Sequence, residues 1–245
     1  MHIAHQLLLQ IHIAIGLIAI IAFWLPVATT KGSRLHRQSG RLYSWAMYAV
    51  SFSAFTMSVI VFFDPIGVRF PSRDLDPARA YEIAASSRMT AAFLLMLALL
   101  VFSSLRHGLL APQTRRNPEA LRSIGHRALV GALGIAGVVV GVIGLMNTQW
   151  LLIIFAALSI ANCVGMTKDI RKAQMNRRES IIAHFQGLIG TGIGAYTALF
   201  AFGGSRLLAE LLSGQWQIIP WIAPAVIGTI ALRQFEKRFT PGVRS

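Results

Sequence analysis

The most regular feature of the sequence is the alternation of long apolar stretches with short polar connections. Seven stretches contain no Asp, Glu, Lys or Arg, and each approaches the ~20 residues that cross a hydrocarbon core as a helix. The prediction is weakest for the last stretch, because Pro220 and Pro224 interrupt it. The predicted spans are 7–28, 43–63, 89–105, 128–146, 150–167, 182–202 and 216–232.

The connections between these stretches predict a single all-α domain, residues 1–245, built as a polytopic transmembrane bundle of seven spans. The turn 147–149 is so short that the fourth and fifth spans must form an antiparallel hairpin. In the longest connection, 64–88, Pro77 is suited to the first position of a short helix.

Charge is distributed unevenly over the two sides of the seven-span arrangement. The connections 29–42, 106–127 and 168–181 and the tail after Leu232 hold 18 basic and 4 acidic residues. The opposite side holds 5 basic and 5 acidic residues. Basic connections stay in the cytoplasm, so the N-terminus is predicted outside and the C-terminus inside.

Composition agrees with a membrane protein and excludes several other classes. Hydrophobic residues make up 55% of the chain and charged residues 13%, about half the share usual in soluble domains. The net charge of +14 follows the positive-inside rule, so no nucleic-acid partner is expected. Cys163 is the single cysteine, which excludes zinc ribbons and covalently attached c-type haem. No predicted span carries a carboxylate, which argues against an ordinary proton-coupled transporter.

Four histidines are predicted at the cytoplasmic ends of different spans. His36 precedes the second span, His107 ends the third, His126 begins the fourth and His184 opens the sixth. Imidazole is a common ligand of haem iron, zinc and copper, so this set suggests an axial haem pair or a metal site formed by His36, His126 and His184. The alternative is that these amphipathic rings simply lie at the interface.

His12 differs, because it is predicted to lie within the first span. Ionisable groups in a bilayer are costly and favour a functional role. With His5 on the same helical face, His12 suggests a polar path from outside or a further cofactor ligand. The alternative is a neutral ring bonded to a neighbouring helix through Asn162, Gln186 or a threonine.

Two other residue sets suggest binding partners. Arg37, Arg41 and Arg127 could hold haem propionates, but contact with anionic lipid headgroups at the cytoplasmic face is the expected use. A glycine stripe along 128–146 indicates tight helix packing, with a flat cofactor, a lipid tail or a second copy of the chain as alternatives. The stripe consists of Gly131, Gly134, Gly137, Gly141 and Gly144.

Several short segments resemble the bacterial membrane protein family catalogued as domain of unknown function 2306. They are HIA at 12–14 with Gly16, KGSRLHRQSGRLY at 31–43 with Ala46 and Met47, HFQGLIG at 184–190 and YTALF at 196–200. The resemblance implies a helical protein of the bacterial inner membrane and no established reaction. Its signature positions would be His12, His36, Arg37, Gly40, Arg41 and His184.

The residues favour a membrane protein that holds haem b or a divalent metal ion in a histidine-lined site for redox work. A metal-dependent lipid hydrolase is one alternative, since Ser33, Ser39, Ser123 and Glu179 lie near the same face. A non-enzymatic carrier, sensor or assembly factor is the other. The sequence therefore leaves open whether the chain is an enzyme.

Overall fold

The computed structural model describes residues 1–71, 75–204, 216 and 219–238, with the side chains of 231 and 235–238 excepted. Every regular element within these ranges is helical. Six helices in them are long and apolar enough to cross a membrane, as expected for a multi-pass membrane protein. They are His2–Ala28, Arg34–Phe63, Pro77–Arg115, Ile124–Met146, Trp150–Arg171 and Arg177–Gly203.

The chain forms two compact units. The first comprises Met1–Ser103 and Arg122–Lys172, and the second comprises Ser104–Leu121 and Ala173–Ser245. The long helix α4 (Pro77–Leu110) runs through the boundary between them. The first unit also contains α1 (His2–Ala28), α2 (Arg34–Phe63), the short α3 (Pro65–Arg69), α5 (Ile124–Met146) and α6 (Trp150–Arg171).

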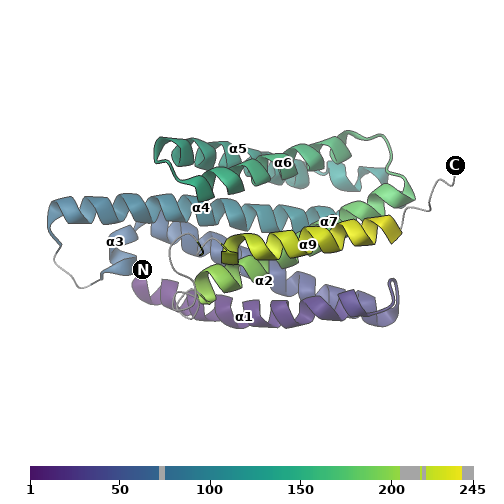
Figure 1. The fold of residues 1–245 in the computed structure, drawn as a ribbon, viewed down its shortest axis with the longest axis horizontal. Coiled ribbons are helices and arrows are strands. Elements are labelled where there is room, and N and C mark those ends of the chain that lie inside the picture. The colour runs from purple at the N-terminus through teal and green to yellow at the C-terminus, as the bar shows by residue number, and fades with distance from the viewer. Residues whose placement is uncertain (72–74, 205–215, 217–218, 239–245) are drawn as a thin grey trace. The chain divides into compact units, whose positions relative to one another are not determined.

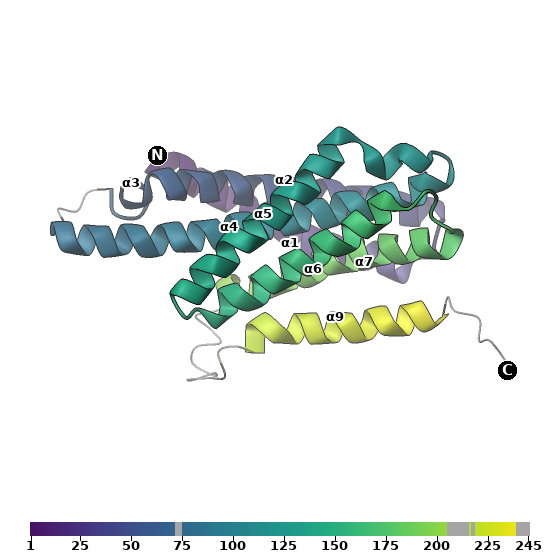
Figure 2. The ribbon, with the colours of Figure 1, turned by 90° about the horizontal axis from the view of Figure 1, so that it is seen from above.

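Two helix pairs organise the first unit. The first is α1 with α2, and the second is the antiparallel hairpin of α5 and α6 (Figures 1 and 2). Asn147 caps the end of α5, and Thr148 takes the left-handed conformation, with a φ of 53°. This reversal confirms the hairpin that the short 147–149 connection predicts. Most outward side chains of α1 are apolar, including Ile3, Leu7, Ile13, Leu17 and Ile21.

The second unit is built around α7 (Arg177–Ala198). Its start is fixed by a capping box, in which the Asn176 side chain accepts from the Glu179 N–H and the Glu179 carboxylate accepts from the Asn176 N–H. The 3₁₀ helices η1 (Ala111–Arg115) and η2 (Pro118–Arg122) follow α4, and a short π-helix η3 (Leu199–Gly203) extends α7. Helix α9 (Ile219–Arg238) packs against α7.

The helix boundaries refine the predicted spans. The expected start at Pro77 is confirmed, but it opens the 34-residue α4 instead of a separate short helix. Asp76 caps this start, because its carboxylate accepts from the Ala78 and Arg79 N–H groups.

The seventh predicted span, 216–232, is confirmed in part, as a helix. Its residues 217–218 lie outside the described residues, and α9 is not among the six helices of spanning character. The apolar part of α9 runs from Ile219 to Leu232, about 20 Å of helix, before the charged end at Arg233.

Candidate functional site

The basic motif after α1 builds the connection to α2. The Lys31 ammonium donates to the carbonyls of Pro26 (2.9 Å) and Val27 (2.7 Å), which lie in the last turn of α1 and lack helical donors. Burial lowers the pKa of Lys31. Gly32 then reverses the chain with a φ of +80°, a region that residues with a Cβ avoid. Ser33 caps α2 by accepting from the His36 N–H.

Two predicted site residues take part in the same connection. His36 Nδ1 lies 3.0 Å from the Pro26 carbonyl oxygen, and the Arg37 guanidinium donates to the Gly32 carbonyl. Much of the KGSRLHR segment therefore ends one helix and begins the next. The predicted anion ligand Arg37 is engaged here, whereas Arg41 and Arg127 are exposed to the surroundings.

His184 makes an equivalent bond in the second unit. Its Nδ1 lies 2.8 Å from the carbonyl oxygen of Gly108, in the last turn of α4. The helical donor for this carbonyl would be residue 112, but Pro112 has no N–H. The helices approach closely at this point, because a Cβ on Gly187 would lie 2.6 Å from the Ser104 carbonyl oxygen and 2.7 Å from the Gly108 Cα.

A third histidine repeats the pattern. His2 Nδ1 lies 2.6 Å from the carbonyl oxygen of Val68, near the end of α3. A carbonyl only accepts hydrogen bonds, so Nδ1 of His2, His36 and His184 is the donor in each contact. Each ring therefore satisfies a carbonyl at or near the end of a helix.

His12 bonds to a neighbouring helix. Its Nδ1 lies 2.8 Å from the Ser53 Oγ on α2, and this hydroxyl donates to the Ala49 carbonyl at 2.8 Å. The hydroxyl is thus the acceptor for His12 Nδ1–H. The structure agrees with the alternative in which the His12 ring bonds to a neighbouring helix. The partner is Ser53, however, and not Asn162, Gln186 or a threonine.

The other two histidines that the sequence predicts at the cytoplasmic face are buried. His107 lies in the last turns of α4, and His126 in the first turn of α5 is 0% exposed. His36 and His126 belong to the first unit, whereas His107 and His184 belong to the second. The shared site predicted for His36, His126 and His184 therefore stays a prediction. Across the described ranges, no three His, Cys, Asp or Glu side chains form a group able to bind a metal ion.

The glycine stripe of α5 faces α6 of the same chain. A Cβ on Gly137 would lie 3.0 Å from Ile160 Cγ1, and one on Gly144 would lie 3.0 Å from Ile153 Cγ1. Gly131 alone of the five has no such neighbour. Tight packing therefore explains most of the stripe, and an oligomer through α5 would have to use its opposite face.

Comparison with known proteins gives no further assignment. No protein-family model matches the chain, and no curated protein or solved structure matches it either. The family resemblance of residues 31–43 and 184–190 stays a prediction.

Proposed function

We propose that this chain is a multi-pass protein of the bacterial inner membrane that binds haem b through histidine and works in electron transfer. The observation that supports this most is the bond from Nδ1 of His36 and of His184 to a helix-terminal carbonyl. Such a bond fixes the orientation of the ring, as second-shell bonds do for histidine ligands.

Each residue would contribute in its own unit. The Pro26 and Gly108 carbonyls orient the rings of His36 and His184, while the exposed Arg41 and Arg127 are suited to carboxylate groups. Bound haem would supply a one-electron couple between ferrous and ferric iron. The absence of a cysteine thiolate pair fits non-covalent haem binding.

The proposed topology has seven spans, with the N-terminus outside and the C-terminus in the cytoplasm. The support is the uneven charge, because 18 of the basic residues fall on one side of such an arrangement. His36, His107, His126 and His184 then all belong to the cytoplasmic half. Cysteine accessibility on the two membrane sides, measured at positions 30 and 148, tests this orientation.

The test of haem binding is an absorption spectrum of the detergent-purified chain, oxidised and then reduced with dithionite, with metal analysis of the same sample. We expect a Soret band that is lost or shifted in His36→Gln or His184→Gln. Glutamine can still donate to the Pro26 or Gly108 carbonyl but does not bind haem iron as imidazole does. His2→Gln is the matched control, because His2 makes the same bond to Val68 and is predicted on the other side.

A second function is favoured by the bonds that His2, His36 and His184 make to backbone carbonyls. If the histidines act only as helix terminators, the chain is a non-enzymatic carrier, sensor or assembly factor. In that case the wild-type chain shows no Soret band, and His184→Ala lowers the unfolding temperature while His184→Gln largely restores it. A missing chromophore would overturn the haem proposal, and stoichiometric zinc in its place would support the hydrolase.

A further inference from the structure

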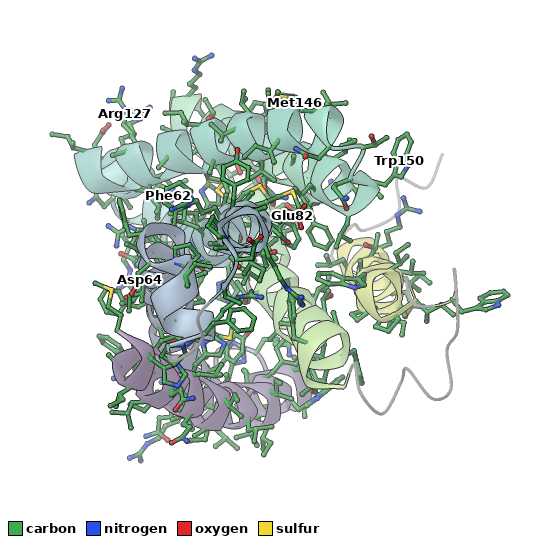
Figure 3. All side chains as sticks on the ribbon, turned by 90° about the vertical axis from the view of Figure 1, so that its left-hand side faces the viewer. Phe62, Asp64, Glu82, Arg127, Met146 and Trp150 are labelled. Carbon is green, nitrogen blue, oxygen red and sulfur yellow. The ribbon has the colours of Figure 1, made fainter. Side chains whose placement is uncertain are left out.

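A pocket of about 470 Å³ lies in the first unit, where two helices end. Phe62 belongs to the last turn of α2 and Asn147 caps α5, while the wall between them comes from residues 85–92 of α4. Figure 3 shows Phe62 and Met146 at the ends of their helices, on the face turned to the viewer. Helices that cross a bilayer end near its headgroups, so the pocket lies at headgroup depth.

One cation lines this pocket. The Arg88 Nε donates to the Phe62 carbonyl oxygen at 3.1 Å, which anchors the guanidinium at the end of α2. Nε–H is one of five donors on this side chain, so the others can bind an anion. No carboxylate is among the lining residues, and Glu82 lies a turn and a half earlier on α4.

The rest of the lining is divided between polar and apolar groups. The Asn147 side-chain amide donates to the Ile143 carbonyl at 2.9 Å, which leaves its Oδ1 as an acceptor. Ser86 adds a hydroxyl near Arg88. Phe62, Met89, Ala92 and Ile143 supply an apolar surface.

We propose that this pocket binds an anionic phospholipid, with the phosphate on the Arg88 guanidinium and an acyl chain against Met89, Ala92 and Ile143. The anchored arginine is suited to bidentate contact with phosphate oxygens. The apolar wall gives a lipid an advantage over free phosphate, since it buries part of the chain. The site is separate from the histidines and does not rest on the proposed haem function.

The test uses the full chain, delipidated in a neutral detergent, with native mass spectrometry as the measure of bound lipid. Three ligands are titrated, namely phosphatidylglycerol, phosphatidylcholine and inorganic phosphate. We expect saturable binding of phosphatidylglycerol that weakens by about tenfold in Arg88→Gln, since a charge-assisted bond is lost. The matched control is Arg79→Gln, which removes an exposed charge from the same helix outside the pocket.

A second variant tests the acyl-chain contact without a change of charge. Ala92→Leu fills the apolar wall and should weaken phosphatidylglycerol binding by several-fold, about the effect of a lost hydrophobic contact. The proposal is overturned if phosphatidylcholine binds as well as phosphatidylglycerol, or if Arg88→Gln and Arg79→Gln behave alike. Saturation by inorganic phosphate at the same concentration would also overturn it, since the lipid chain would then contribute nothing.

Discussion

The two helix pairs of the first unit are held together by different means. Between α1 and α2 two side-chain hydrogen bonds join the helices, from His12 to Ser53 and from His36 to Pro26, beside an edge-on contact of Phe23 with Tyr43. Between α5 and α6 the close contacts depend on glycine. Gly137 and Gly144 have no side chain, so the two helices can approach closely. Both means suit a bilayer, where the burial of apolar surface between helices gains little and packing or hydrogen bonds decide association.

The difference predicts which substitutions each pair tolerates. The α5–α6 contact depends on small volume, so any added side chain must displace α6. The α1–α2 contact depends on particular donors and acceptors, so it is sensitive to the identity of a few residues. Gly16 of α1 illustrates the contrast, because a Cβ there would meet nothing within 4 Å.

The largest effect is expected from Gly144→Leu in α5. Its Cβ would lie 3.0 Å from Leu152 Cβ and 3.2 Å from the Ile153 backbone nitrogen, so the start of α6 must shift. Overpacking of this kind should lower the free energy of unfolding by about 3 kcal/mol. Equilibrium unfolding in mixed micelles of detergent and denaturing detergent measures it.

Gly131→Leu is the matched control, since the same side chain is added to the same helix at a position with no neighbour within 4 Å. It should not lower the free energy of unfolding and should raise it by about 0.5–1 kcal/mol, because glycine is unfavourable inside a helix. Equal losses in the two variants would show that the glycine stripe does not mediate the contact with α6.

A smaller effect is expected from Gly32→Ala in the α1–α2 connection. Alanine at a φ of +80° costs about 1–2 kcal/mol, because its Cβ crowds the backbone in the left-handed region. The same substitution at Gly16, inside α1, should instead stabilise the chain by about 0.5–1 kcal/mol, since alanine restricts the unfolded state. If both variants lose stability equally, the left-handed conformation of Gly32 is not the cause of the loss in Gly32→Ala.

Most of the fold follows from patterns along the chain. Six of the seven predicted spans correspond to helices of spanning character, and the short 147–149 connection predicts the hairpin, because length and hydropathy are local properties. Helix ends are less predictable. Helix α4 begins at Pro77, well before its apolar stretch, because Asp76 caps it and the first turns need no apolar side chains.

The site is less predictable from sequence, because its acceptors are backbone carbonyls. Any residue provides a carbonyl, so neither Pro26 nor Gly108 is marked as the partner of a histidine. One signal exists in retrospect, since Pro112 lies four residues after Gly108 and cannot donate to it. The partner of His12 depends on the register of α1 against α2, which hydropathy does not encode.

The smallest effect is expected from the bond between His12 and Ser53, and a double-mutant cycle measures it. The cycle combines His12→Leu with Ser53→Ala, since each removes one side of the 2.8 Å contact. Polar bonds between membrane helices average about 0.6 kcal/mol, so the coupling energy should lie between about 0.5 and 1.7 kcal/mol. The control pairs His12→Leu with Ser58→Ala, because Ser58 is equally buried on α2 and bonds to its own helix at Ala54. A coupling energy of zero with Ser53, or an equal one with Ser58, would mean that shape and not polar bonding selects the register of α1 and α2, and the contrast between the two helix pairs would disappear.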